Sequence, residues 1–320
     1  MDIHQLSKRR NFLKTAGFAA AGTVAGRQVQ ASTESSMPMI DFYQHRVSRL
    51  VLGSNPISGA AHFNGLLGSM MKEYFTEDNL QKLIFDAHAN GINFMQGHYD
   101  PGIQQCIEKV RDSGGTFNWM FIVNLYKEGA GPYKHSLLNP VVQKGIKTAK
   151  PIALIHHGSQ GDDLWQQGKR KFEQVNDAFK RIADMGIIPG MSTHLPETIQ
   201  YVEDKGWDCR FYMGCFYRVG KIKAKEWKKR TGLTPIGEYY TEEMPEEMCR
   251  VLRQVDKPCF GYKILAAGRK TKNARQVESC YQDAFGMLKK NDGVIVGMFP
   301  KYKDHVALGA EYTRKHGALT

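Results

Sequence analysis

Short apolar runs alternate with amphipathic segments along most of the chain. The runs have the length of β-strands and are apolar almost throughout, as expected for parallel strands buried on both faces. Each is followed by a segment in which apolar residues recur at helical spacing. The pattern therefore predicts eight strand–helix units. The predicted strands cover residues 47–53, 92–97, 117–124, 151–158, 187–194, 209–217, 258–268 and 293–300.

Eight such units in a chain of 320 residues predict an α/β protein with a single (β/α)8 TIM barrel. An open, doubly wound sheet is the alternative, but it should carry a G-x-G-x-x-G turn after its first strand. The corresponding turn, LGSNPISGA (52–60), lacks that motif. The helices are expected at 76–91, around 103–110, and at 138–148, 163–185, 196–206, 242–254, 274–290 and 302–316.

Polar residues with chemical capacity gather at one end of the predicted strands. In TIM barrels the active site lies at the carboxyl ends of the strands, where these residues should converge. The opposite strand ends carry ordinary turn residues such as Pro151 and Pro258. The residues at the carboxyl ends are Ser54, Asn55, Gln96, His98, Tyr99, Asn124, His156, His157, Ser192, Thr193, His194, Tyr217 and Lys263.

Several strand motifs occur in the order found in one known family. GINF (91–94), LIHHG (154–158), MSTHLPETIQYV (191–202), GYKILAAG (261–268) and GVIVGMFPKYKDHVAL (293–308) resemble successive barrel segments of the aldo/keto reductase superfamily. The likeness spans most of residues 47–316. It implies reduction of a carbonyl by NAD(P)H.

The resemblance also implies roles for particular residues. His156 matches the histidine that helps bind the carbonyl in the reductases. The loop AAGRKTKN (266–273) matches a region that helps hold the dinucleotide, which makes Arg269 and Lys270 candidate cofactor-binding residues. Loops after the last strands of this fold often bind phosphate.

The chain departs from the reductases at the residues that activate hydride transfer. Gln96 stands where the family has an aspartate, and Asn124 stands where it has a lysine. Tyr99 matches the family's tyrosine acid only after a shift of two residues. Without a nearby cation, a tyrosine near its ordinary pKa of ~10 is a poor acid or base at neutral pH. We therefore expect no hydride transfer, with an NAD(P)H-dependent reductase as the alternative.

Proton transfer beside a carbonyl, as in isomerases or lyases, suits the same residues. A histidine near pKa ~6.5 moves protons at neutral pH, and Lys263 or a tyrosine would face the oxyanion. A Schiff base on Lys263 is a further alternative. The predicted catalytic residues are His98, Tyr99, His156, His194 and Lys263, and the predicted substrate-binding residues are Asn55, Gln96, Asn124, His157 and Tyr217.

Two other classes of function stay open. A divalent metal held by His98, His156 and His194 would polarise a carbonyl or acidify water, although the chain has no local ligand motif such as H-E-x-x-H. A non-catalytic carbohydrate-binding protein is the other. Long loops at 54–75 and 218–240 carry aromatic residues suited to a sugar, and loops of this length often act as lids.

The N-terminus resembles a twin-arginine export signal. KRRNFLK (8–14) is followed by the small, weakly apolar TAGFAAAGTVAG (15–26), and Ala31 ends a stretch suited to cleavage. We expect residues 1–31 to be the signal, read by the twin-arginine translocase, and 32–46 a polar lead-in to a barrel domain at 47–320. The mature protein is expected in the periplasm or otherwise exported through the twin-arginine pathway, with no transmembrane segment.

Charge and cysteine content narrow the picture further. The formal net charge is +12, of which residues 1–31 contribute +4, and the remaining basic residues are spread along the chain without a nucleic-acid-binding motif. The partner is therefore expected to be a small-molecule substrate. Six cysteines form no C-x-x-C pair, and a chain of this length can bury a core without disulfides, so we expect buried free thiols.

Overall fold

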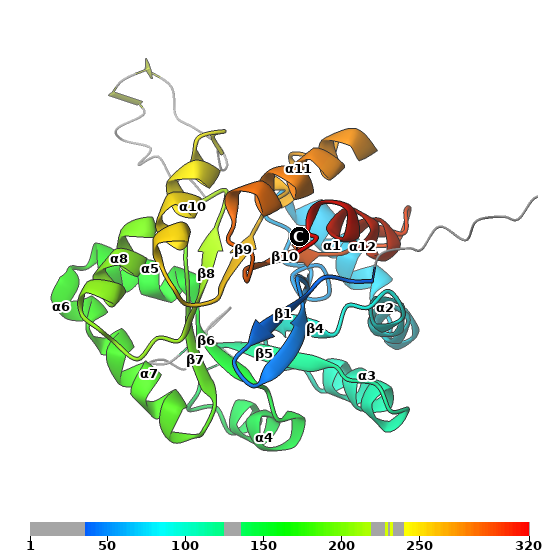
Figure 1. Cartoon of the computed structure of the whole chain (residues 1–320), viewed down its shortest axis with the longest axis horizontal. Helices are drawn as coiled ribbons and strands as arrows, with labels where there is room; N and C mark the ends of the chain where they lie inside the picture. Colours follow the sequence, from blue (N-terminus) through cyan, green and yellow to red (C-terminus); the bar gives the residue numbers. More distant parts are fainter. Residues whose placement is uncertain (1–35, 125–135, 219–227, 230, 233–239, 320) are drawn as a thin grey trace, which may run out of the picture. The chain divides into compact units, whose positions relative to one another are not determined.

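Eight parallel strands close into a barrel in the computed structural model, as predicted (Figure 1). The structure describes residues 36–124, 136–218, 228–229, 231–232 and 240–319. Each strand pairs with the next along the chain, and β10 pairs with β3 to close the ring. The strands are β3 (Leu50–Gly53), β4 (Phe94–Gly97), β5 (Asn118–Val123), β6 (Ala153–His156), β7 (Ile188–Thr193), β8 (Phe211–Cys215), β9 (Cys259–Tyr262) and β10 (Gly293–Gly297).

Helices surround this barrel and connect its strands (Figure 1). The predicted helix at 163–185 is instead three helices. The first break is at Gly168, whose φ of +108° lies in the region that favours glycine, and the second is at Glu173. The helices are α1 (Gly65–Tyr74), α2 (Glu77–Ala89), α3 (Pro101–Asp112), α4 (Pro140–Ala149), α5 (Gly158–Gln166), α6 (Lys169–Phe172), α7 (Gln174–Asp184), α8 (Pro196–Asp204), α10 (Met244–Gln254), η3 (Ala266–Gly268), α11 (Ala274–Met287) and α12 (His305–His316).

A small hairpin closes the amino-terminal end of the barrel. It consists of β1 (Met39–Phe42) and β2 (His45–Ser48), and it begins within the expected polar lead-in. Phe42 is fully buried, and its ring contacts Phe94, Phe211 and Phe260, which lie near the starts of their strands. The hairpin thus fills the end of the barrel opposite the expected active site.

Strand alternation separates two apolar layers. Along β6, Ile155 belongs to the cluster inside the barrel, whereas Leu154 belongs to the cluster between barrel and helices. A side chain at a strand's end therefore faces either the barrel mouth or the helix layer. No helix of the described residues is long and apolar enough to cross a membrane. All six cysteines are buried free thiols, as predicted.

Candidate active site at the carboxyl ends of the strands

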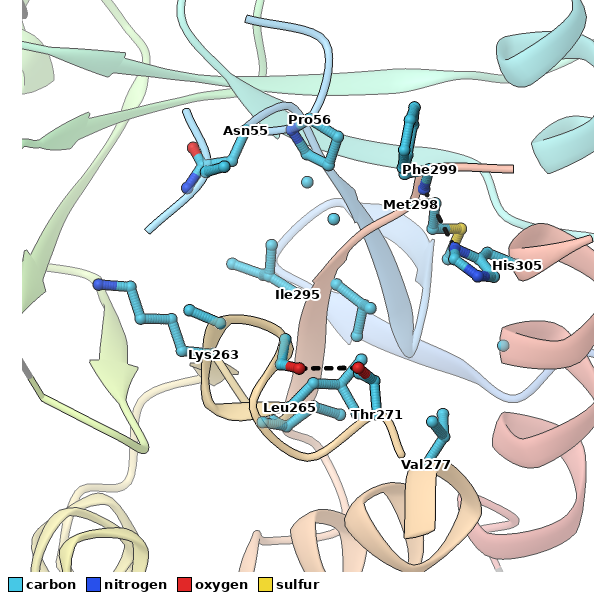
Figure 2. A pocket seen from close by; sticks show the side chains of 18 of the residues that line it. Asn55, Pro56, Lys263, Leu265, Thr271, Val277, Ile295, Met298, Phe299 and His305 are labelled. Carbon is cyan, nitrogen blue, oxygen red and sulfur yellow. Dashed lines mark hydrogen bonds between the residues drawn. The ribbon is translucent and has the colours of Figure 1, made fainter. Parts of the chain in front are cut away.

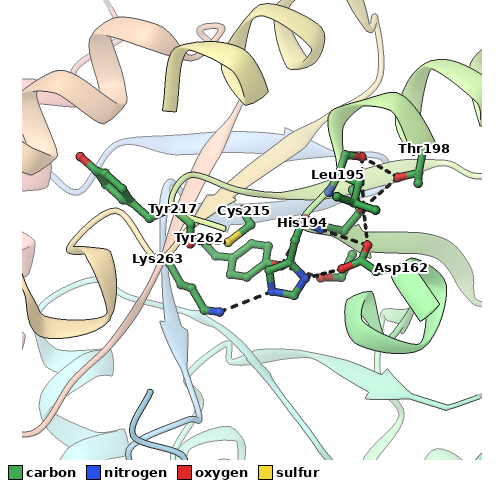
Figure 3. A network of polar contacts seen from close by, with 10 residues as sticks. Asp162, His194, Leu195, Thr198, Cys215, Tyr217, Tyr262 and Lys263 are labelled. Atoms are coloured by element: carbon green, nitrogen blue, oxygen red, sulfur yellow. Dashed lines mark hydrogen bonds and ion pairs between the residues drawn. The ribbon is translucent and has the colours of Figure 1, made fainter. Parts of the chain in front are cut away.

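Three charged or titratable side chains form a continuous polar chain at the barrel mouth. His194 follows β7 and Lys263 follows β9, while Asp162 lies on α5. The Asp162 Oδ2 atom is 2.7 Å from His194 Nδ1, and His194 Nε2 is 3.4 Å from Lys263 Nζ (Figure 3). As predicted, the side chains of His194 and Lys263 therefore lie next to each other in the structure.

Asp162 fixes the state and orientation of the His194 ring. A carboxylate accepts hydrogen bonds, so Nδ1 carries the proton and Nε2 presents its lone pair toward Lys263. The Thr193 hydroxyl donates to Asp162 Oδ1 at 2.9 Å, and the His194 backbone N–H lies 3.3 Å from the same oxygen. The Asp162 side chain is only 12% exposed. Its carboxylate is thus held in one place while His194 faces the mouth.

Sequence reasoning missed Asp162. It lies within a helix, away from the strand ends where polar residues were sought, and its neighbour Asp163 is an exposed aspartate with no such role. Only the packing of α5 against β7 brings the Asp162 carboxylate to His194. No spacing rule along the chain would have picked one of these two aspartates over the other.

Lys263 occupies a strained backbone position. Its φ is +59°, and Ala266 and Ala267 in the same loop also have positive φ angles. Non-glycine residues in this region are uncommon, and they concentrate at sites where geometry serves function. Among the described residues, no carboxylate forms an ion pair with Lys263, in contrast to Lys270, which pairs with Glu242. Its ammonium is therefore available to a negatively charged or polarised ligand atom.

Lys263 also lines a cavity of 490 Å³ (Figure 2). The cavity starts at the barrel mouth and continues between α11, α12 and α1. Its volume falls in the range of ~300–1,000 Å³ typical of small-molecule sites. Of the residues predicted to bind substrate, Asn55 and Gln96 lie in its wall beside Lys263.

His62, from the long loop after β3, is a further titratable group in the cavity wall. Burial, together with nearby positive charge from Lys263 and His194, lowers its pKa to about 4. His62 is therefore neutral at pH 7 and acts there as a hydrogen-bonding group. Arg269 donates to the His62 carbonyl at 3.0 Å and stacks on Tyr240 at 4.1 Å. These contacts hold the loop over the site.

The two predicted cofactor-binding residues contact loop residues instead of lining the cavity. Arg269 makes the contacts just described. Lys270 donates to Glu242 at 2.5 Å and to the Tyr217 hydroxyl at 3.1 Å. Tyr217, predicted to bind substrate, is held in this cluster, and burial raises its pKa. The cluster ties the start of α10 to the loop after β9.

His156 requires a correction, because it does not share the mouth with His194. Its ring is fully buried and lies in the helix layer, against Gly161 of α5, as its alternation with Ile155 dictates. Burial, aided by His157, lowers its pKa to about 3. Neither ring nitrogen has a hydrogen-bond partner among the described residues. His156 is thus a neutral core residue.

Tyr99 requires the same correction. Its ring packs on Trp119 and Phe121 and against the backbone of Gly145 in α4, so it also lies in the helix layer. Its hydroxyl donates to Gln104 at 2.9 Å. The tyrosine matched to the reductase acid therefore points away from the barrel mouth.

The remaining predicted residues lie around the rim. His98 contacts the Ile122 carbonyl at 3.0 Å through Nδ1, and its ring centroid is 5.9 Å from that of His157. Asn124 is fully buried, and its backbone carbonyl accepts from the Leu137 N–H. Within the described part of the chain, no group of three or more His, Cys, Asp or Glu residues is placed to hold a metal ion. His98, His156 and His194 thus do not form the predicted ligand set.

Comparison with known proteins finds likeness in structure only. No family model matches the chain, and no curated protein matches it by sequence. A thermostable aldo-keto reductase solved with the inhibitor epalrestat is similar at 11% identity and a TM-score of 0.49, over 88% of this chain and 98% of that one. An aldo/keto reductase from Brucella melitensis is similar at 10% identity and a TM-score of 0.45, over 87% and 100%.

Proposed function

We propose that this protein is an exported enzyme that performs acid–base chemistry, of isomerase or lyase type, on a small carbonyl- or sugar-like molecule. The observation that carries the proposal is the chain from Asp162 through His194 to Lys263. It joins an oriented base to an unneutralised cation at the mouth of a cavity large enough for a substrate.

Each residue of this chain has a distinct task. His194 Nε2 removes a proton from the carbon next to the substrate carbonyl, and the electrons of that C–H bond form a C=C bond. The carbonyl electrons move to its oxygen, whose negative charge Lys263 stabilises. Where the α-carbon carries a hydroxyl, as in a keto-sugar, the oxyanion gains a proton and that hydroxyl loses its own to become the new carbonyl. Return of the proton from His194 to the former carbonyl carbon then completes the isomerisation. Asp162 keeps the ring oriented and stabilises its protonated form, but does not touch the substrate.

Hydride transfer by the reductase route is poorly supported by the residue positions. Tyr99 lies in the helix layer, and Gln96 and Asn124 replace the family's charged pair. Two polar groups in the loop that would meet a dinucleotide already have protein partners. Thr271 donates to the Gly268 carbonyl, and Lys272 N–H donates to Gln276. The positions of Tyr99, Gln96 and Asn124 therefore favour acid–base chemistry over hydride transfer.

Exchange of the substrate proton with solvent tests the proposal without knowledge of the product. Keto-sugars and simple ketones are incubated with the protein in D2O, and deuterium uptake is followed by mass spectrometry. The wild type should catalyse exchange, and His194→Ala should reduce the rate by about 10²–10⁴-fold, the usual contribution of a general base. His45→Ala, on the hairpin at the other end of the barrel, is the matched control and should leave the rate unchanged.

Other outcomes would favour the alternatives. Robust NADPH oxidation with carbonyl substrates would replace the proposal by a reductase. Tight sugar binding with neither exchange nor turnover would indicate a carbohydrate-binding protein. A rate that is the same in His194→Ala and wild type would remove His194 from the chemistry.

Export is the second part of the proposal, and it rests on the KRRNFLK motif (8–14), which lies outside the described residues. Because the arginine pair is read as an address by the translocase, Arg9→Lys combined with Arg10→Lys should retain the protein in the cytoplasm. Cell fractionation of the full chain measures this. Normal periplasmic recovery of the double variant would overturn the assignment.

A further inference from the structure

The cavity changes character along its length. At the barrel mouth it is polar, with Lys263, Asn55, Gln96 and His62 in its wall. Farther out it is mainly apolar, bounded by Val277 on α11 and by other side chains from the loop after β10 and the surrounding helices (Figure 2). These further apolar residues are Leu67, Met71, Met298, Phe299 and Leu308. The polar members of the cavity there are Thr271, Asn273, Lys303 and His305. In Figure 2, Lys263 lies at one side of the view and Val277 at the other.

One polar group stands out within the apolar part. Tyr281 lines the cavity and is only 2% exposed, yet its hydroxyl makes no hydrogen bond with any described residue. The hydroxyl lies beside Gly309 of α12, which also lines the cavity. Its ring contacts Tyr312 with centroids 5.5 Å apart. Because buried hydroxyls in proteins are nearly always hydrogen-bonded to protein or to water, the Tyr281 hydroxyl offers a hydrogen bond to a polar group that enters this part of the cavity.

From these features we propose that the substrate is a carbonyl compound that carries a phenol-like group. Resting on the proposed function, the proposal places the carbonyl at the cavity mouth beside Lys263, on the side of the ammonium that His194 does not occupy. The aromatic ring lies against Val277 in the apolar part, and the ring's hydroxyl pairs with Tyr281. A bare sugar would leave the apolar wall exposed to water.

A series of binding measurements with wild-type protein tests the site for the aromatic ring separately from the chemistry. The probes are butanone, methyl ketones joined to a phenyl ring by alkyl linkers of increasing length, and the para-hydroxyl form of each. Dissociation constants are measured by calorimetry. The best phenyl ketone should bind at least about tenfold more tightly than butanone, because burying a ring removes a large apolar area from water. The para-hydroxyl group should tighten binding again, by about fivefold.

Variants of cavity residues test whether the tighter binding of phenyl ketones arises in the cavity. Val277→Trp fills the apolar part and should abolish the advantage of phenyl ketones over butanone. Val141→Trp makes the same exchange at an exposed site on α4 and should retain it. Tyr281→Phe should remove only the para-hydroxyl gain. Unchanged circular dichroism and melting temperature establish that each variant is folded.

The outcomes separate this inference from the proposed function. The substrate inference is wrong if phenyl ketones bind wild-type protein no more tightly than butanone, or if their higher affinity survives Val277→Trp. This holds even where His194-dependent proton exchange persists. Displacement of the phenyl ketone by NADPH would likewise overturn it, because the cavity would then be a nucleotide site. If the gain depends on Val277 and Tyr281 but no proton exchange occurs, the cavity assignment holds and the acid–base proposal falls.

Discussion

At the scale of single residues, the site depends on which nitrogen of His194 carries a proton. Asp162→Asn leaves the size of the side chain unchanged but lets an amide N–H face Nδ1, which would favour the wrong tautomer. We expect proton exchange to fall by up to about 10⁴-fold, the loss seen when an aspartate that orients a general-base histidine becomes asparagine. Asp163→Asn, at the exposed neighbouring residue, is the control and should change neither rate nor stability.

A distinct readout separates orientation from general damage in Asp162→Asn. Nitrogen-15 NMR of the imidazole reports the tautomer directly, and it should change in the variant while the affinity for a ketone changes little. An unaltered tautomer together with an unaltered exchange rate would mean that Asp162 has only a structural role.

At the scale of elements, strand alternation explains both what the sequence predicted and what it missed. The apolar runs located all eight strands, because each is buried on both faces and bounded by turns. They did not say which way the last side chain of each strand points, since a shift of one residue reverses the face. His156 and Tyr99 were therefore grouped with His194, although both lie in the helix layer. The convergence of His194 with Lys263 was predictable, and the contribution of α5 was not.

The position of His156 at the end of β6 leads to a prediction on stability. His156→Met replaces a buried ring without hydrogen-bond partners among the described residues by an apolar side chain of similar length. We expect the free energy of unfolding to rise by about 1–2 kcal/mol, because an unsatisfied buried polar group is removed. Proton exchange should be unaffected. Loss of exchange in a folded variant would return His156 to the active site.

The same variant should alter the response of the protein to acid. The pKa of His156 is about 3 in the folded protein and ~6.5 when unfolded, so the unfolded state binds more protons between these values. Its contribution to stability is complete above pH ~6.5 and is lost as the pH falls toward about 3. Urea unfolding across this pH range should show that the free energy of unfolding falls less with acid in His156→Met than in wild type. Equal losses would mean that His156 does not titrate in this way.

At the scale of the whole barrel domain, the two ends of the barrel have separate tasks. The carboxyl end holds the charged site and the cavity, while the amino end is closed by the hairpin and the ring of Phe42.

Because Phe42 is fully buried among three other phenylalanines, Phe42→Ala should lower the free energy of unfolding by about 3–5 kcal/mol. Tyr43→Ala, next to it and 42% exposed, should cost much less. The rate of proton exchange per folded molecule should be the same in both variants as in wild type, since neither residue touches the mouth. Denaturant melts and exchange assays on the same samples measure both quantities. A rate that falls in Phe42→Ala while the protein remains folded would show that the hairpin also shapes the active site, and the division of the barrel into a stabilising end and a catalytic end would fail.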